Sequence, residues 1–161
     1  MTSSLQTPIE RRQSIEQICL RLLARREHSR RELLDKLALR GYRQEEVEPV
    51  ITEIAGQNWQ NDERFAECYV RQRLEKGYGP LRIRYELQQR GITGMDIDAL
   101  ADENCGGWLN LLLDVYAGKF ADEKQLSYHE WLKRSRFLLQ RGFNSGMIKG
   151  LPKALNIRIS H

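Results

Sequence analysis

The side chains that could carry out covalent or metal chemistry are few and scattered along this chain of 161 residues. The candidates are three cysteines and three histidines: Cys19, Cys68, Cys105, His28, His129 and His161. The cysteines are odd in number and form no C-x-x-C pair, so they predict neither a disulfide framework nor a zinc site. No histidine has a second ligand at metal-binding spacing, and we expect no metal. We interpret the cysteines as small apolar side chains in a reducing compartment.

Motifs for other kinds of catalysis are also missing from the sequence. It contains no G-x-x-x-x-G-K-[ST] phosphate-binding loop and no G-x-S-x-G nucleophile motif. The clustered acids Glu45, Glu46 and Glu48 lie at a predicted helix start, where carboxylates complement the helix dipole. We therefore expect a protein that is not an enzyme and needs no cofactor.

The charged residues occur in blocks of alternating sign. The net charge is +4, the pI is about 9.1, and 30% of residues are charged. Residues 11–43, 71–90 and 119–161 are basic, with net charges of +6, +4 and +6, whereas residues 44–67 and 93–118 carry −6 and −5. Two interpretations stay open. The blocks neutralise each other across neighbouring helices, or the basic helices face a polyanion or an acidic protein surface.

The sequence repeats itself at intervals of about fifty residues. Arg-Gly followed by an aromatic or aliphatic residue occurs at Arg40-Gly41-Tyr42, Arg90-Gly91-Ile92 and Arg141-Gly142-Phe143, and the flanking apolar positions move in step. This self-similarity predicts three tandem copies of one unit. We predict a flexible segment over 1–12, repeats over 13–58, 61–104 and 106–155, and a tail over 156–161.

Each repeat has the pattern of three helices. In the first, Ile15, Ile18, Cys19, Leu22 and Leu23 form one apolar stripe. Ser29 with Glu32 predicts a capping box for a second helix that buries Leu33, Leu34, Leu37 and Ala38 and ends at Gly41. Val47, Val50, Ile51 and Ile54 predict the third helix.

The second and third repeats carry matching signals. Pro80 starts a helix that ends at Gly91, and Thr93 with Asp96 caps the next. In the third repeat, an apolar helix from Trp108 to Tyr116 and a loop at 118–126 precede a capping box of Ser127 and Glu130. A short last helix holds Met147, Ile148 and Leu151.

No segment alternates apolar and polar residues, so no sheet is expected. The predicted fold is all-α: three tandem three-helix, helix-turn-helix-like repeats in an elongated, curved array. No apolar run of about 18 residues exists, and the first eight residues have no apolar signal core. We expect no membrane span, no secretion and a cytoplasmic location.

Several motifs together resemble the RecX family, regulators of the RecA recombinase. The most specific is Lys76-Gly77-Tyr78-Gly79-Pro80, followed by Ile83, Glu86-Leu87 and Arg90-Gly91-Ile92. His28-Ser29 with Glu32-Leu33 resembles the family's first repeat, and Asn61-Asp62 with Arg64-Phe65-Ala66 resembles the start of its second. Phe137-Leu138-Leu139 with Arg141-Gly142-Phe143 resembles the third, where Ser145-Gly146 departs from the family pattern.

The resemblance implies a monomeric, non-catalytic bacterial protein that acts in homologous recombination, DNA repair and the SOS response. Family members bind in the groove of the RecA–DNA filament and restrain ATP hydrolysis, strand exchange and coprotease activity. Weak, non-specific binding to single- or double-stranded DNA is expected beside this activity.

We predict that basic side chains of the second helices, with two tyrosines, contact the filament or exposed phosphate. Arg82, Tyr85 and Gln89 fall on one outward helical face beside the Gly77–Gly79 loop. The full predicted set is Arg30, Arg31, Arg40, Arg71, Arg73, Lys76, Tyr78, Arg82, Arg84, Tyr85, Lys133, Arg134 and Arg136.

An alternative function comes from the three-helix units themselves. Such units resemble helix-turn-helix modules, so a DNA-binding regulator that acts directly on nucleic acid is the second hypothesis. A sequence-specific binder would discriminate one duplex by about 4 kcal/mol or more. A non-specific binder would instead show only steep salt dependence.

Overall fold

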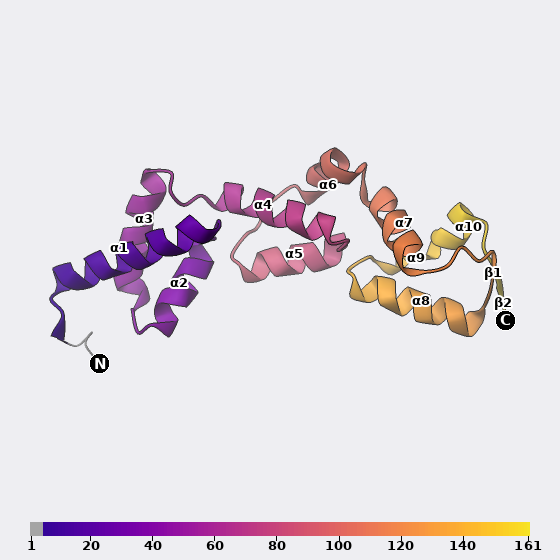
Figure 1. The fold of residues 1–161 in the computed structure, drawn as a ribbon, viewed down its shortest axis with the longest axis horizontal. Helices are drawn as coiled ribbons and strands as arrows, with labels where there is room; N and C mark the ends of the chain where they lie inside the picture. The colour runs from indigo at the N-terminus through magenta and orange to yellow at the C-terminus, as the bar shows by residue number, and fades with distance from the viewer. Residues whose placement is uncertain (1–4) are drawn as a thin grey trace. The chain divides into compact units, whose positions relative to one another are not determined.

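The computed structural model describes residues 5–161, whose regular elements are α-helices and two short strands (Figure 1). The elements are α1 (Pro8–Arg25), α2 (Arg30–Leu39), α3 (Gln44–Gly56), α4 (Asp62–Glu75), α5 (Pro80–Gln89), α6 (Ile97–Cys105), α7 (Trp108–Lys119), β1 (Gln125–Ser127), α8 (Tyr128–Gln140), α9 (Ser145–Lys149), α10 (Leu151–Leu155) and β2 (Arg158–Ser160). The predicted all-α class is confirmed. The third repeat differs in its last helix, which is divided at Gly150 into α9 and α10.

The described chain forms two units. Unit 1 comprises residues 5–68 and 87–95, and unit 2 comprises residues 69–86 and 96–161. Helices α4 and α5 therefore each contribute residues to both units.

Unit 1 has an apolar core between α1, α2 and α3. Its fully buried side chains follow the predicted helical spacing: Ile15, Cys19, Leu33, Leu37, Val47, Val50, Ile51 and Ile54. Burying one Leu or Ile side chain contributes about 1.5–3 kcal/mol, so this cluster is the main stabilising element of the unit. Burial raises the pKa of the Cys19 thiol to about 11, which keeps it protonated and unreactive. Ala38, predicted to be buried, is exposed.

The N-terminal boundary also differs from the prediction. Helix α1 begins at Pro8, inside the segment predicted to be flexible, and residues 1–4 of that segment lie outside the described residues. Thr7 caps the helix through a capping box with Glu10. Arg11 donates two hydrogen bonds to the carboxylate of Glu46 on α3, and this interaction lowers the pKa of Glu46 to about 2. The cap and the ion pair order residues 8–12.

The predicted helix boundaries are correct at most caps. Ser29 and Glu32 form the reciprocal capping box at the start of α2, and Ser127 accepts from the amide of Glu130 at the start of α8. Gly41 adopts a left-handed backbone with φ of 90°. The prediction of Thr93 as the cap of α6 is wrong: Asp96 is the N-cap and accepts from the amide of Ala99.

Unit 2 contains a second core, formed along α7, α8 and the helices that pack beside them. Leu112 on α7, Leu138 on α8, Phe143 after α8 and Leu151 on α10 are all completely buried. Helix α6 packs on α7, while α8 packs on α9 and on both strands. Gly106 and Gly107, both with positive φ, make the sharp turn from α6 to α7.

The small sheet corrects two expectations. Strands β1 and β2 pair in parallel, with Leu126 opposite Ile159, although the sequence predicted no sheet and a plain tail over 156–161. Three-residue strands are too short to show alternation, and their partners are more than thirty residues apart in sequence. Buried Leu126 and Ile157 anchor this end of the third repeat.

Two contacts join consecutive repeats, and each lies within one unit. In unit 1, the turn at Arg90-Gly91 lies against the first turn of α2. A Cβ on Gly91 would be 3.0 Å from Cβ of Arg31, and Nε of Arg90 is 3.7 Å from Oε2 of Glu32. Asp62, at the start of α4, accepts a hydrogen bond from the amide of Arg30 at 2.8 Å. We call this the first inter-repeat contact.

The second inter-repeat contact, in unit 2, joins the loop at Gly79 to the turn at Gly142. The amide of Gly79 donates to the carbonyl of Arg141 at 2.7 Å, and the amide of Leu81 donates to the carbonyl of Gly142 at 2.9 Å. A Cβ on Gly79 would lie 2.6 Å from the carbonyl carbon of Gly142, closer than real Cβ contacts allow. Two backbones meet here because Gly79 has no side chain.

The close approach at Gly79 yields a stability prediction. Gly79→Ala forces a methyl group into the backbone of Gly142, and we expect the free energy of unfolding to fall by about 1–3 kcal/mol, the usual cost of overpacking. Urea denaturation followed by circular dichroism measures the change.

The matched control is Gly118→Ala, because no described residue lies within 4 Å of a Cβ at this position in α7. This change should stabilise the protein by about 0.5–1 kcal/mol through helix propensity. Equal unfolding midpoints for Gly79→Ala and the parent protein would contradict a tight backbone contact.

Candidate functional site

Tyr78, in the loop between α4 and α5, is surrounded by arginines from three elements of unit 2. The guanidinium carbons of Arg73, Arg82 and Arg141 lie 3.9, 4.2 and 4.8 Å from the centre of its ring. Arg73 comes from α4, Arg82 from α5, and Arg141 from the turn after α8. Guanidinium groups stack well on aromatic faces, so the tyrosine keeps three like charges in one place.

Glu86 neutralises part of this cluster. Its carboxylate accepts hydrogen bonds from Arg73 at 2.8 and 2.9 Å and from the hydroxyl of Tyr69 at 2.9 Å. The Nε atom of Arg82 is 3.8 Å from the same carboxylate. Arg141 donates to the carbonyl of Lys76 at 2.8 Å, and Arg82 donates to the carbonyl of Gln140 at 3.2 Å. The cluster therefore keeps an excess of positive charge while its side chains hold the second inter-repeat contact.

These contacts give some of the predicted binding residues a structural role. Arg73 and Tyr78 are half-buried, and the guanidinium group of Arg73 lies over the ring of Tyr78. Arg82 is exposed, so it can present charge to a partner as well as bind Gln140.

The outer face of α5 carries the exposed residues of the middle repeat. Leu81 and Tyr85 are 51% and 60% exposed and lie four residues apart, on one side of the helix. Arg84 lies between them in sequence and pairs with Asp98 of α6 at 3.0 Å. The indole of Trp108 donates to the same carboxylate oxygen at 2.8 Å. Arg71 and Lys76, at α4 and just after it, are exposed as well.

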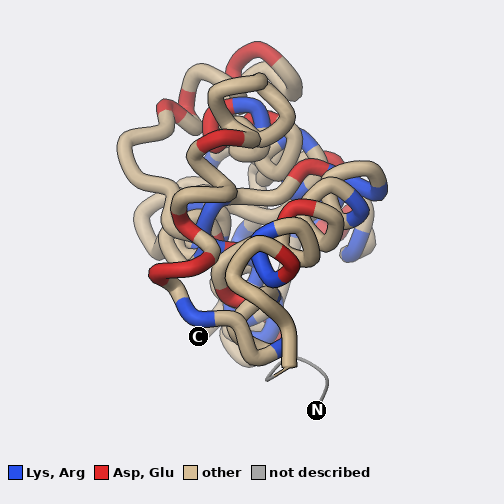
Figure 2. Tube along the Cα trace, turned by 90° about the vertical axis from the view of Figure 1, so that its left-hand side faces the viewer, with Lys and Arg blue, Asp and Glu red and all other residues tan. Residues whose placement is uncertain are grey.

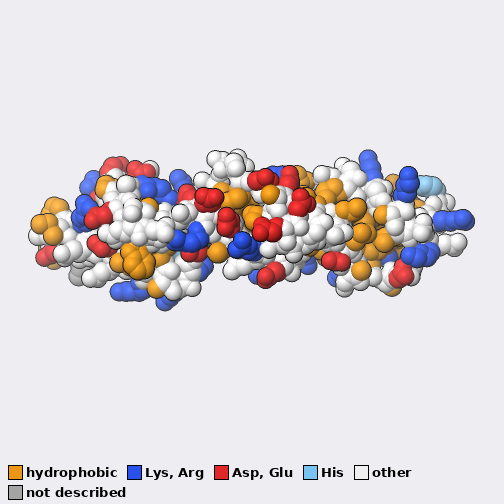
Figure 3. Space-filling view, turned by 90° about the horizontal axis from the view of Figure 1, so that it is seen from above, with side chains coloured by type: hydrophobic (Ala, Val, Ile, Leu, Met, Phe, Trp, Pro, Cys, Tyr) orange, Lys and Arg blue, Asp and Glu red, His pale blue; other side chains and the backbone are white. Residues whose placement is uncertain are grey.

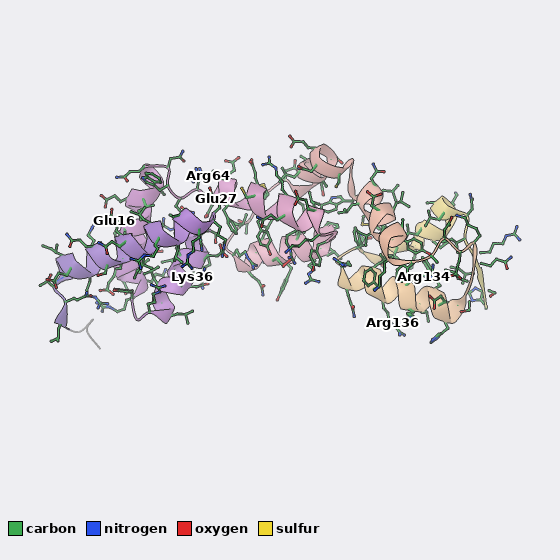
Figure 4. The ribbon with its side chains drawn as sticks, in the orientation of Figure 1. Glu16, Glu27, Lys36, Arg64, Arg134 and Arg136 are labelled. Atoms are coloured by element: carbon green, nitrogen blue, oxygen red, sulfur yellow. The ribbon has the colours of Figure 1, made fainter. Side chains whose placement is uncertain are left out.

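On α8, three predicted residues separate into two groups. Lys133 and Arg136 are exposed and three residues apart, and Figure 4 shows Arg136 directed away from the ribbon. Arg134 is only 3% exposed. Its guanidinium donates to the hydroxyl of Tyr116 at 2.7 Å and to the carboxylates of Glu130 and Glu123, both at 3.1 Å. A buried cation held by two carboxylates and a tyrosine hydroxyl is not available to a partner, so Arg134 does not belong to the candidate set.

The three predicted arginines of α2 and its C-cap, Arg40, differ in their partners. Arg30 donates to the hydroxyl of Thr52 at 2.9 Å and to the carbonyl of Glu48 on α3. Arg31 pairs with Asp35 at 3.3 Å, with both side chains more than half exposed. Arg40 is exposed and makes no side-chain hydrogen bond or ion pair within residues 5–161.

Ion pairing within unit 1 is otherwise extensive. Arg64 of α4 pairs with Glu27 at 2.7 Å, and the labels of these two residues lie together in Figure 4. Arg12 pairs with Glu53, and Arg26 pairs with Glu32. Figure 2 accordingly shows basic and acidic positions interspersed along the chain trace. Part of the basic block at 11–43 is therefore neutralised by acids of the following block: Arg11 and Arg43 pair with Glu46, and Arg12 pairs with Glu53.

The sequence reading missed Arg141, Glu86 and Tyr69. All three lie in the cluster around Tyr78 or directly beside it. The available signal for Arg141 was the recurrence of Arg-Gly at the end of each second helix.

His28, in unit 1, is a buried titratable group beside the first inter-repeat contact. Its Nδ1 atom lies 3.0 Å from the carbonyl of Arg26, and its Nε2 atom lies 3.1 Å from the ammonium group of Lys36. Because the carbonyl only accepts and the ammonium only donates, the neutral ring with hydrogen on Nδ1 fits both partners. Burial lowers the pKa of His28 below its ordinary value of 6.5. Within residues 5–161, no three His, Cys, Asp or Glu side chains gather in a way that could hold a metal ion.

Comparisons with known proteins match most of the chain. Models of the first and second three-helix domains of RecX match residues 17–53 and 61–100. "Regulatory protein RecX" of Legionella pneumophila strain Corby is 41% identical over 83% of this chain and 89% of its own length. The protein of the same name from Pseudomonas putida KT2440 is 38% identical over 92% of both chains.

Two solved structures share the fold. A crystal structure of a regulatory protein RecX has a TM-score of 0.70 over 90% of this chain and 74% of its own, at 22% identity. The structure of RecX from Lactobacillus salivarius has a TM-score of 0.61 over 90% of this chain and 96% of its own, also at 22% identity.

The environment of His28 predicts acid sensitivity. Since the folded state lowers its pKa, the unfolded chain binds the proton more readily, and stability decreases as the pH falls below about 6.5. The charged groups around the ring are Arg26, Lys36 and Glu32. We expect the free energy of unfolding to fall more steeply between about pH 7 and about pH 5 in the parent protein than in His28→Gln.

Urea unfolding at several pH values measures both slopes. His129→Gln, which changes an exposed histidine, is the control and should keep the parent slope. Parallel pH profiles for the parent protein and His28→Gln would show that His28 is not the group responsible.

Proposed function

Because the chain belongs to the RecX family of regulatory proteins, we propose that it regulates the RecA recombinase, mainly as an inhibitor, without catalysing a reaction itself. In this proposal it binds as a monomer in the groove of RecA–DNA filaments in the cytoplasm and restrains ATP hydrolysis, strand exchange and coprotease activity. The observation that carries the proposal is the identity of 41% to a RecX regulatory protein over 83% of the chain. Among the described residues, no helix has both the length and the apolar character needed to cross a bilayer.

The exposed helix faces support binding to a protein polymer. Arg84 and Tyr85 on α5, and Lys133 and Arg136 on α8, present cations beside exposed apolar surface. Aromatic and arginine side chains of this kind are frequent anchors of protein interfaces. A polymer offers the same acidic surface on every subunit, so several modest contacts on one chain add through multivalency.

Charge reversal on these faces tests the proposal. Two double variants are made separately: Arg84→Glu with Tyr85→Ala, and Lys133→Glu with Arg136→Glu. For each, we expect the concentration that gives half-maximal inhibition of the DNA-dependent RecA ATPase to rise by about tenfold or more. Helicity should stay close to that of the parent, since these side chains are exposed. Arg84→Glu also removes the exposed ion pair with Asp98, which is worth at most about 1 kcal/mol, so the melting temperature should fall by only about a few degrees.

The matched control is Arg21→Glu with Arg25→Glu on α1, which reverses two exposed cations outside the candidate faces. Inhibition by this control should remain at the parent level. If both test variants inhibit as strongly as the control, the assignment of these faces is wrong. If the parent protein itself leaves the ATPase unchanged, the proposed function is wrong.

A second candidate activity, direct contact with DNA, is favoured by the charge of the C-terminal segment. Residues 131–161 contain seven Lys and Arg and no Asp or Glu, whereas the first 130 residues hold three more acids than bases. Figure 3 shows basic side chains gathered over this end of the chain on the face in view. Five of the seven are exposed and form no ion pair within the described residues: Lys133, Arg136, Lys149, Lys153 and Arg158. Cations without acidic partners are suited to the phosphate backbone, and they supply affinity without sequence preference.

Salt dependence tests this contact without RecA. The association constant K for DNA decreases as salt concentration rises. For Lys149→Ala with Lys153→Ala, we expect this dependence to be shallower: the magnitude of the slope of log K against log salt concentration should decrease by about 1 for each phosphate contact removed. Fluorescence anisotropy with labelled single-stranded DNA measures the slope. Arg21→Ala with Arg25→Ala is the control and should keep it. Identical slopes in all three proteins would assign DNA binding elsewhere, and a strong preference for one duplex would favour a helix-turn-helix regulator.

A further inference from the structure

The Arg-Gly turn that ends each second helix occurs three times in the structure. The glycines Gly41, Gly91 and Gly142 all have left-handed backbones, with φ of 90°, 77° and 101°. Two of the three turns are covered by the first turn of another second helix. A Cβ on Gly91 would lie 3.0 Å from Cβ of Arg31 in α2, and a Cβ on Gly142 would lie 2.7 Å from the backbone nitrogen of Arg82 in α5.

The groups around the covered turns show what such a turn binds. The amide of Leu81, near the start of α5, donates to the carbonyl of Gly142, and helix starts have amides without partners inside the helix. In unit 1, Arg90 approaches the carboxylate of Glu32 in the first turn of α2. Each covered turn therefore receives a helix N-terminus, with one polar contact of its own. The carbonyl of Gly142 accepts an amide hydrogen, whereas at the Gly91 turn Arg90 lies 3.7 Å from an acid.

The third turn, Leu39-Arg40-Gly41, has no such helix against it. Within residues 5–161, nothing lies within 4 Å of a Cβ placed on Gly41. Leu39 is 89% exposed, the largest exposure among the described large apolar side chains. Arg40 has no charged partner in the same residues. An apolar side chain, a cation and a glycine turn are thus exposed together at the end of α2.

A second copy of this chain is a poor occupant for that turn. The corresponding helix start would be that of α8, which has 13 residues where α2 and α5 have 10. At the start of α8, the ring of Tyr128 contacts that of His161 with centroids 5.2 Å apart. The two strands also pack against α8. Stacking of one copy on another would have to displace these groups.

We propose that the Leu39-Arg40-Gly41 turn is a docking surface for the N-terminal turn of an α-helix in a partner protein, one that carries a carboxylate in that turn. The two inter-repeat contacts are the intramolecular models of this interaction. The proposal rests on the proposed function, because the partner used to test it is the RecA filament. It assigns to Arg40 a particular kind of contact, and it adds Leu39 and Gly41 to the predicted contact residues.

The experiment compares Gly41→Asn with a matched control, Gly94→Asn. Asparagine tolerates the left-handed backbone better than other residues with a side chain, so both variants should fold. Gly94 has φ of 76° and, like Gly41, no described residue within 4 Å of an added Cβ, but it is not in an Arg-Gly turn. We expect Gly41→Asn and Arg40→Glu to weaken binding to RecA filaments on single-stranded DNA by about tenfold. Gly94→Asn should stay within about twofold of the parent protein.

Equal affinity of Gly41→Asn and Gly94→Asn for the filament would overturn the inference and leave the proposed function standing. Failure of the parent protein to bind filaments would overturn both.

Photocrosslinking identifies the occupant itself. With benzoylphenylalanine in place of Leu39, the crosslinked peptide should come from the first turn of a RecA helix. Benzoylphenylalanine in place of Leu109, which is 55% exposed on α7, should not give this product. Products at position 39 that join two copies of this chain, reach only DNA or spread over RecA loops would each overturn the proposal.

Discussion

The contact between the backbones at Gly79 and Gly142 is the constraint on which unit 2 depends. Two segments of backbone can approach closely enough to form both hydrogen bonds only where no Cβ intervenes, and Gly79 meets that condition. The surrounding side chains then follow. Arg141 and Arg82 are brought to opposite carbonyls, and Tyr78 is placed among their guanidinium groups. The sequence Gly77-Tyr78-Gly79-Pro80 is therefore first a structural motif, and any role in binding acts through the exposed residues that it positions.

Arginine has two separate uses in this chain. In unit 2, Arg134 of α8 donates to the carboxylate of Glu130 and to the hydroxyl of Tyr116. Arg73 of α4 donates to the carboxylate of Glu86 and stacks on the ring of Tyr78. Both arginines fix the geometry of their helices. On the helix faces, Arg136 and Arg40 have no such partners within the described residues. Composition cannot separate the two uses, because both kinds of residue add the same charge. Only the second kind contributes to an electrostatic surface that a partner meets.

Local signals predicted most of the fold. The core positions Leu37 and Ile51 follow from helical spacing, and the start of α2 follows from the pairing of Ser29 with Glu32. The strands β1 and β2 could not be predicted, since their pairing joins distant segments and each is too short for a pattern. At the start of α6, the spacing of Thr93 and Asp96 suggested a cap that belongs to Asp96 alone.

The candidate site was predicted less well, for a related reason. Amino-acid type indicates that Arg134 is charged but not that Tyr116, Glu123 and Glu130 surround it. Nor does it show that Arg84 pairs with Asp98 while Lys133 has no acidic partner within the described residues. These distinctions depend on which helices pack together. The exposed turn at Gly41 became visible only by comparison with the two covered ones.

Each inter-repeat contact contains at least one amide whose hydrogen bond is made by the neighbouring repeat. The amide of Arg30 donates to Asp62, and the amide of Leu81 donates to the carbonyl of Gly142. These two protons exchange with solvent deuterium only when the corresponding contact opens. Their exchange rates therefore measure the opening of the two contacts separately, in the intact protein and without an attached probe.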